Sequence, residues 1–330
     1  MTMSSETAAA PVARGLRMPD FFIAGHAKSG TTALYEMLRK HRQIYLPDAK
    51  EPWFFATDMR PRFQPALAGR PPETIEEYAA LFADAQPGQR VGEASSSYLW
   101  SRTAAAGIAR VAPEARIIAI LREPASFLRS LHLQLLQTHV ESERDLRKAI
   151  ALEEARRNGK HVPRRSHRPQ LLQYADHVRY VEQLRRYRSL FGAERLLVLI
   201  YEDFRRDNTG TVQAVLRFLQ LDSDEPIEPL EANPTVALRS QQLDELVHSV
   251  STGRGALPRA AKAALKLLTP PAMRRDLLRL TQRRLVHGSP RPPDERLMLE
   301  LRRRFKGEVV ALSEYLDRDM VTLWGYDRLA

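Results

Sequence analysis

The segment Gly25-His26-Ala27-Lys28-Ser29-Gly30-Thr31-Thr32 combines residue types that bind phosphate. Its first residue, Gly25, ends the apolar run Phe21–Gly25, and a helical pattern begins at Thr31. A loop between a buried strand and a helix N-terminus directs backbone N–H groups at one anion, and the helix dipole adds positive charge. The glycines allow close approach of the backbone, and the hydroxyls of Ser29, Thr31 and Thr32 add donors. We predict a phosphate-binding loop here.

The position of the lysine separates this loop from nucleoside-triphosphate loops. Gly25 and Gly30 keep the spacing of the motif G-x-x-x-x-G-K-[ST], but Thr31 occupies the lysine position and Lys28 lies earlier. In that motif the lysine reaches the β- and γ-phosphates, and a donor without a γ-phosphate does not need it. The alternative is a tight turn with an incidental lysine, which the flanking strand and helix disfavour.

A second candidate anion site follows the apolar run Arg116–Leu121. Arg122 stands at its carboxyl end, where ligands bind in α/β proteins, and Ser130 follows eight residues later. A guanidinium fork is suited to a phosphate dianion. The alternative for Arg122 is an ion pair with Glu123 or Glu93.

Two stretches carry a family resemblance. FFIAGHAKSGTTALYEMLRKH resembles the 5′-phosphosulfate loop of sulfotransferases that use 3′-phosphoadenylyl sulfate (PAPS), and IIAILREPASFLRSLHLQLL resembles their 3′-phosphate-binding segment. The resemblance covers about residues 20–220. It implies PAPS as co-substrate and 3′-phosphoadenosine 5′-phosphate (PAP) as product, with Lys28 near the bridging oxygen. The donor-binding residues that it implies are Lys28, Ser29, Gly30, Thr31, Thr32, Arg122 and Ser130.

The acceptor needs a general base. The segment Lys50–Phe55 resembles the one that carries the catalytic glutamate in the branch that includes heparan sulfate sulfotransferases, which implies Glu51. The alternative is a solvated acid beside Lys50. Trp53 stands where that branch can have a histidine and Ala94 where some members have a lysine, so the resemblance does not extend to a heparan-type substrate.

Other residues have weaker assignments. His132 and His139 are further candidate bases, and Glu93 is expected to order the pocket wall. By resemblance of the stretch ANPTVALRSQQL, Arg239 is expected to contact the nucleotide. The aromatic residues 53–55 fit either an acceptor site or the core. No regular metal-ligand spacing is found, and we predict no metal.

The elements that must position these residues follow an alternating pattern. Short apolar runs alternate with helical ones, which favours an α/β fold with a P-loop-type central parallel sheet flanked by helices. The expected strands are 21–25, 116–121 and 196–201. The expected helices begin at Thr31 and Pro124 and span 170–191 and 208–219, and a basic helical extension lies toward the C-terminus.

Composition and charge bound the function. The 330 residues contain no cysteine, which excludes disulfides and thiolate chemistry, and the net charge is +11. Residues 254–306 hold 15 Lys or Arg against four acids. We expect 1–18 to be a flexible tail and 19–330 one domain, with 251–293 a basic helical lid or insertion, and 254–306 a possible membrane-surface contact. Without a signal-peptide-like or membrane-spanning apolar run, a cytoplasmic location is expected.

The predicted function is sulfuryl transfer from PAPS to a hydroxyl or amine of a carbohydrate, lipid or small natural product. One alternative is a P-loop kinase or NTPase, against which the missing post-glycine lysine counts. The other is a basic non-enzymatic protein that binds nucleic acid or acidic membrane, which leaves both phosphate motifs unexplained. A nucleic-acid partner is not expected.

Overall fold

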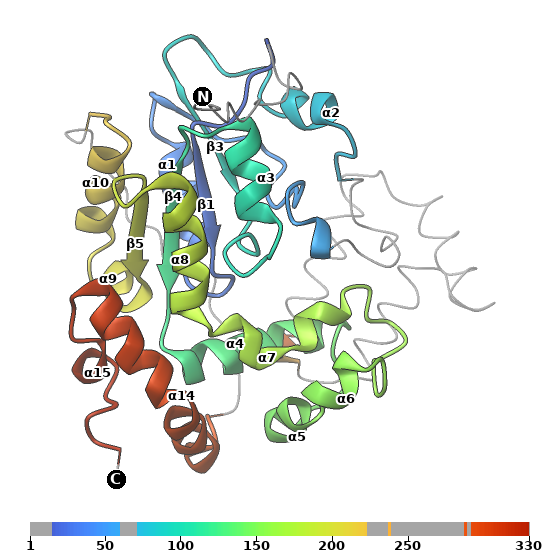
Figure 1. The fold of residues 1–330 in the computed structure, drawn as a ribbon. Coiled ribbons are helices and arrows are strands. Elements are labelled where there is room, and N and C mark those ends of the chain that lie inside the picture. The colour runs from blue at the N-terminus through green and yellow to red at the C-terminus, as the bar shows by residue number, and fades with distance from the viewer. Residues whose placement is uncertain (1–14, 60–70, 223–236, 239–286, 289–291, 330) are drawn as a thin grey trace, which may run out of the picture.

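The core of the fold is a sheet of five parallel strands in the order β2-β3-β1-β4-β5. The computed structural model describes residues 15–59, 71–222, 237–238, 287–288 and 292–329 (Figure 1). The sheet consists of β1 Phe21–Gly25, β2 Ile44–Tyr45, β3 Arg90–Ala94, β4 Arg116–Leu121 and β5 Leu196–Ile200. The predicted α/β fold with a central parallel sheet is confirmed.

The strands form where apolar runs are buried on both faces of the sheet. All five residues of β1 are buried, and so are the last five of β4. Side chains alternate between the two faces along a strand. Phe22 therefore packs into the core layer on one face, while Phe21 and Ile23 pack into the layer on the other.

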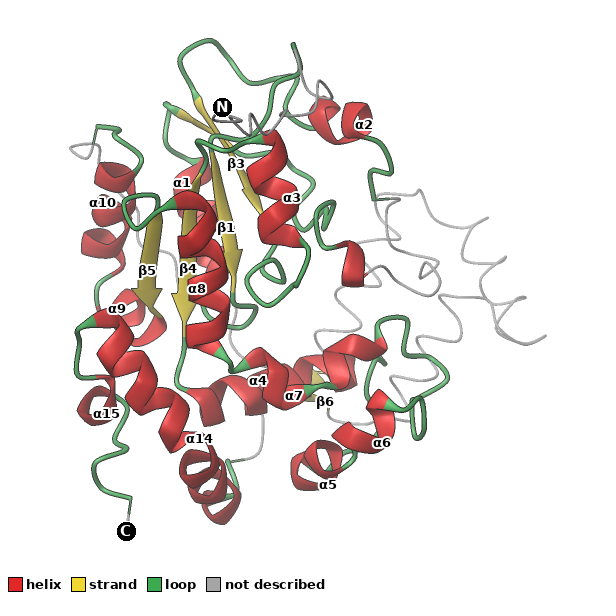
Figure 2. Ribbon diagram, viewed as in Figure 1, coloured by secondary structure: helices red, strands yellow, loops and turns green. Residues whose placement is uncertain are grey.

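Helices cover both faces of the sheet (Figure 2). The helices α1 and α10 pack on one face, and α3 and α8 on the other; α14 packs against α4 and α8. The helices are α1 Thr31–Arg39, α2 Ile75–Ala80, α3 Ala104–Val111, α4 Pro124–Gln137, α5 Leu146–Ala151, α6 Glu153–Arg157, α7 Tyr174–His177, α8 Tyr180–Phe191, α9 Tyr201–Arg206, α10 Asn208–Phe218, α14 Glu295–Leu316 and α15 Met320–Leu323. Two 3₁₀ helices, η2 Thr57–Met59 and η3 Pro169–Leu172, and the antiparallel pair β6 Ala237–Leu238 and β7 His287–Gly288 complete the described elements.

One expected helix is wrong as a single element. Residues 170–191 form η3, α7 and α8 because Gln173 and Arg179 have non-helical backbone angles (φ −93°, ψ 77° and φ −78°, ψ 61°). The side-chain amide of Gln183 donates to the carbonyls of Asp176 and His177 at the end of α7, which stabilises the break. The expected strand 196–201 ends at Ile200, because Tyr201 already begins α9.

Several expectations fall outside the described residues. They concern most of the tail 1–18, Arg239 and nearly all of the segment 251–293. Within the described residues, no helix has the length and apolarity needed to cross a membrane.

Candidate active site

The predicted phosphate loop connects β1 to α1. Gly30 is the N-cap of α1, with a left-handed φ of 89°, and no side chain caps the helix or places an acid in its first turn. A Cβ on Gly25 would lie 2.7 Å from Cβ of Leu99 and therefore could not be accommodated without a shift. The loop thus leaves an uncapped helix N-terminus open to an anion.

The loop residues differ in their exposure. Ser29 and Thr31 are buried, whereas Lys28 is half-buried. Burial, and then the positive charge of Arg122, lower the pKa of Lys28. An anion bound beside Lys28 would offset both effects, which fits a site that binds a negatively charged group.

Arg122 meets the loop directly. Its Nη1 donates to the carbonyl oxygen of Lys28 at 2.8 Å, and its guanidinium lies 4.5 Å from the ring centre of Tyr201. Its own carbonyl accepts a hydrogen bond from Tyr180 Oη at 2.8 Å. The Nε of Arg122 is buried without a hydrogen-bond partner among the described residues, so it remains available as a donor to an anion.

The alternative ion pairs of Arg122 are absent from the described contacts. Glu123 instead caps α4 by accepting from the backbone N–H groups of Ala125 and Ser126. Glu93 accepts from Tyr78 Oη at 3.1 Å. Among the described contacts, the Arg122 guanidinium is thus hydrogen-bonded to the loop and paired with neither carboxylate.

Ser130 lies buried within α4, the helix that follows Arg122. Its neighbour Arg129 has its pKa lowered by burial and then by the charge of Arg122. The two guanidinium groups thus add positive charge in the same region, and sequence reasoning missed Arg129.

Glu51 is held at the carboxyl end of β3. Its Oε1 accepts from Ser96 Oγ at 2.6 Å, and its Oε2 accepts from Ser96 N at 3.0 Å and from Trp53 Nε1 at 2.7 Å. Its side chain is 22% exposed, so it is neither fully solvated nor sealed in the core. These three hydrogen bonds fix the carboxylate and leave Oε1 with room for one further donor.

Lys50 connects Glu51 to the phosphate loop. Its Nζ donates to Thr32 Oγ1 at 2.8 Å and lies 3.8 Å from Glu51 Oε1. Burial lowers the pKa of Lys50, and the carboxylate of Glu51 opposes that shift. The predicted base and the predicted phosphate loop therefore border one site.

Trp53 and Arg168 form a wall beside Glu51. The Arg168 guanidinium lies 3.3 Å from the ring centre of Trp53, which donates to Glu51. Burial lowers the pKa of Arg168 to about 10, and Glu51 opposes the shift. Phe54 and Phe55 belong to the core instead: Phe55 is buried, and Phe54 stacks on Tyr78 at 4.6 Å between ring centres.

The candidate bases on α4 have other surroundings. His132 is buried, with Nδ1 2.8 Å from Tyr174 Oη and Nε2 3.1 Å from the Arg144 carbonyl. His139 follows the end of α4 with a φ of 56°. With both ring nitrogens occupied, the geometry of His132 favours a packing role over proton transfer.

The sulfotransferase domain model matches residues 18–249. The chain belongs to the sulfotransferase domain family. It is also similar to mouse carbohydrate sulfotransferase 15, with 30% identity over 156 residues; the match spans 35% of this chain and 27%, about a quarter, of that protein. Among solved structures, a sulfotransferase from Alicyclobacillus acidocaldarius is similar, with a TM-score of 0.56 and 27% identity, covering 75% of this chain and all of that one.

Sulfotransferase membership gives the site its general chemistry, and the geometry adds residues that the sequence left unassigned. Lys50, Ser96 and Arg168 border Glu51, and Tyr201 packs on Arg122. The adjacency of Lys50 and Glu51 was the available signal for Lys50. Arg168 carries no such signal, because more than a hundred residues separate it from Trp53. Among the described residues, no group of three or more His, Cys, Asp or Glu is arranged to hold a metal ion.

Proposed function

We propose that this sulfotransferase uses PAPS and transfers its sulfuryl group to a hydroxyl or amine of a carbohydrate, lipid or small natural product. The observation that carries the proposal is the hydrogen bond of Arg122 to the Lys28 carbonyl at 2.8 Å. It brings the two predicted anion sites next to each other, which supports a single adenosine-based donor with a phosphate at each end.

The donor fits the groups on either side of that contact. The uncapped N-terminus of α1, with Ser29, Gly30, Thr31 and Thr32, is suited to the 5′-phosphosulfate. The unpartnered Nε of Arg122 is suited to the 3′-phosphate, with Ser130 as the second ligand. Arg239 is proposed as a further nucleotide contact and lies outside the described residues.

The transfer step follows from the same residues. Glu51 takes the proton of the acceptor O–H or N–H as that atom forms a bond to sulfur. The bond between sulfur and the bridging oxygen of the 5′-phosphate breaks, and PAP leaves with the electron pair. Lys28 stabilises the negative charge that develops on that oxygen. Lys50 contacts both Thr32 and Glu51 and fixes their positions relative to each other.

Calorimetry with PAP and with AMP tests the donor assignment. We expect at least about tenfold tighter binding of PAP, because a charge-assisted phosphate contact contributes about 1.5–3 kcal/mol. Arg122→Ala should bring the affinities for PAP and AMP to the same value, and both should fall because the loop loses its hydrogen bond to Arg122. Equal affinity of the unmodified protein for the two nucleotides would overturn the proposed 3′-phosphate site.

A further inference from the structure

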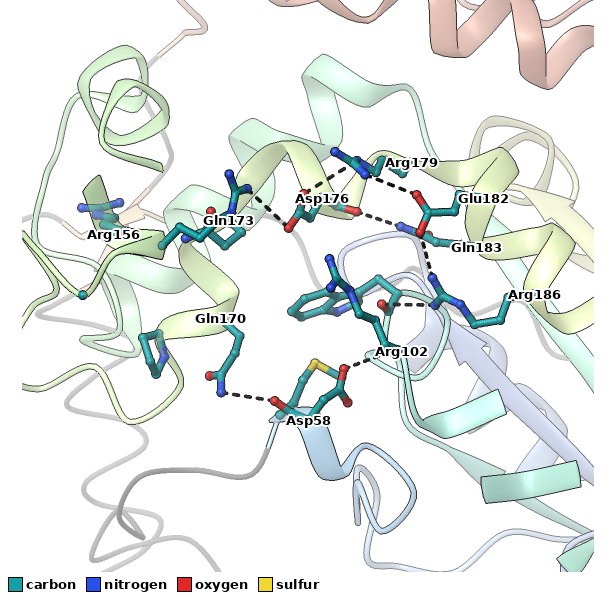
Figure 3. Close-up of a pocket in the computed structure, with 15 residues that line it drawn as sticks. Asp58, Arg102, Arg156, Gln170, Gln173, Asp176, Arg179, Glu182, Gln183 and Arg186 are labelled. Carbon is teal, nitrogen blue, oxygen red and sulfur yellow. Dashed lines mark hydrogen bonds and ion pairs between the residues drawn. The ribbon is translucent and has the colours of Figure 1, made fainter. Parts of the chain in front are cut away.

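A pocket of about 470 Å³ opens beside the site, between η2, the segment after Trp100 and the helices α6, α7 and α8 (Figure 3). Its volume lies in the range of small-molecule sites. Trp100, Met59 and Pro169 supply apolar surface, and the rest of the lining consists mainly of carboxylates, carboxamides and guanidinium groups.

The pocket borders the donor loop. Gln183 lines it, and the Gln183 Oε1 lies 2.7 Å from Nε2 of His26, two residues before Lys28. His26 is fully buried, and its ring packs 5.1 Å from that of Phe127. A wall of the pocket is therefore shared with the loop that we assign to the donor.

The pocket also borders the segment that carries Glu51. Asp58, seven residues after Glu51, lines it, and the Asp58 carbonyl accepts from Gln170 Nε2 at 3.2 Å (Figure 3). Gln170 follows Arg168 closely, and the Arg168 guanidinium lies on Trp53. A molecule in this pocket would thus lie close to the donor loop and to the segment that carries Glu51.

Among the described residues, the ion pairs of the lining leave the Arg102 guanidinium without a carboxylate partner, while the Asp58 carboxylate accepts from Ser101 Oγ and from the backbone N–H of Arg102. Asp176 and Glu182 form ion pairs with Arg157, Arg179 and Arg186, at 3.1–3.7 Å. Arg156 is buried and forms a bidentate pair with Glu141 at 2.7 Å. Within the described part of the chain, the Arg102 guanidinium has no such partner, and Figure 3 shows it extending into the pocket.

The uncharged polar groups of the lining favour a ligand that carries hydroxyl groups. The amide oxygens of Gln170 and Gln173 are buried without a hydrogen-bond partner among the described residues. A buried oxygen that accepts no hydrogen bond is costly, and a hydroxyl group of a bound ligand would donate the missing hydrogen bond. The apolar face of Trp100 suits the C–H surface of such a molecule.

We infer that this pocket binds the sulfate acceptor, and that the acceptor is a hydroxyl-rich molecule with one carboxylate or similar anionic group, which Arg102 recognises. The inference rests on the proposed function. It narrows the open acceptor classes to polyhydroxylated anions.

Two probes that differ in one group test the inference. 4-Nitrophenyl β-D-glucuronide carries a carboxylate where 4-nitrophenyl β-D-glucoside carries a hydroxymethyl group. We expect saturation-transfer NMR in the presence of PAP to show about tenfold tighter binding of the glucuronide. With PAPS, Arg102→Gln should raise the KM for the glucuronide about tenfold and leave kcat and PAP affinity unchanged.

The matched control is Arg110→Gln, on the exposed side of α3 and outside the pocket lining. It should keep the preference for the glucuronide. Equal binding of the two glycosides, binding of neither, or an unchanged preference in Arg102→Gln would overturn the inference. If PAP failed to bind while the glycoside preference held without it, the donor assignment would fail and the ligand class of the pocket would stand.

Discussion

Arg122 donates its Nη1 to the carbonyl oxygen of Lys28 although 94 residues separate them. The contact pins the phosphate loop from one side, while Lys50 binds Thr32 from the other. The two interactions hold the loop from both ends, so we expect the Lys28 side chain to have a defined position relative to both proposed anion sites. Such preorganisation of a charged group is what stabilises a leaving group in the transition state.

Lys28→Ala should lower kcat about 100- to 1,000-fold, the loss typical of one preorganised charge-stabilising group. PAP affinity should fall much less, because the loop backbone and Arg122 remain. Single-turnover transfer from PAPS and calorimetry with PAP measure the two effects. Lys40→Ala, at the exposed end of α1, is the control. An equal loss of kcat in both variants would contradict the assignment.

Glu51→Gln should keep nucleotide affinity and lower kcat at least about 100-fold, because a carboxamide is too weak a base to take the proton from the sulfate acceptor. A rate assay and PAP calorimetry on the same variant separate chemistry from binding. A Glu51→Gln protein with full turnover would eliminate Glu51 as the base.

The indole of Trp53 offers a control on that assignment. Trp53→Phe removes the donor to Glu51 Oε2 and should lower kcat several-fold, whereas Trp53→His retains a ring N–H and should recover part of the rate. If the two variants lose the same rate, Trp53 does not position Glu51.

Local pattern predicted the parts of the site that depend on chain-neighbouring residues. The loop 25–32 and the strand before Arg122 were readable because a strand, a loop and a helix follow one another in sequence. Their mutual contact could only be expected from the rule that ligands bind at the carboxyl ends of parallel strands. The contact itself depends on strand order, with β1 and β4 as neighbours.

Long-range contacts carried no local signal. The stacking of Arg168 on Trp53 and the pairing of Gln183 with His26 join segments more than a hundred residues apart. The break at Gln173 was missed because apolar spacing alone does not show that tertiary contacts override a helical pattern. The surroundings of His132 also depend on residues elsewhere in the chain, because its ring nitrogens lie beside the Tyr174 hydroxyl and the Arg144 carbonyl.

Glu93 gives the protein a predicted pH dependence of stability. Burial raises the pKa of Glu93 to about 7, against hydrogen bonds from Ser95, Tyr98 and Tyr78 that lower it. The native state therefore holds this proton more tightly than the unfolded state does. The resulting stability is present below about pH 4.5 and is lost as pH rises through about 7, a change on the order of 3 kcal/mol.

Glu93→Gln mimics the protonated carboxyl and should flatten this part of the profile, raising the free energy of unfolding at pH 8. Urea unfolding at pH 5, 6.5 and 8 measures it. Glu76→Gln, on the exposed side of α2, should keep the slope of the parent protein. A Glu93→Gln profile parallel to that of the parent would show that Glu93 is not the titrating group.

The C-terminal segment makes a hydrogen bond to Glu123, the residue that follows Arg122. Tyr326 Oη donates to Glu123 Oε1 at 2.6 Å, and Trp324 Nε1 donates to Glu202 Oε2 at 2.9 Å. Glu123 is buried and caps α4, so the hydroxyl of Tyr326 fixes the start of the helix that follows Arg122. Tyr326 is therefore a positioning residue for the proposed 3′-phosphate site.

Tyr326→Phe should lower the free energy of unfolding by about 1–3 kcal/mol, because it leaves a buried carboxylate oxygen with one donor fewer. It should also reduce the ratio of PAP to AMP affinity several-fold while AMP affinity stays the same, an effect that loss of stability alone does not produce. Tyr45→Phe removes a weaker tyrosine hydrogen bond away from Arg122, to the Leu81 carbonyl at 3.2 Å, and should keep the ratio. A Tyr326→Phe protein that is less stable but discriminates PAP from AMP as well as its parent would limit Tyr326 to a structural role.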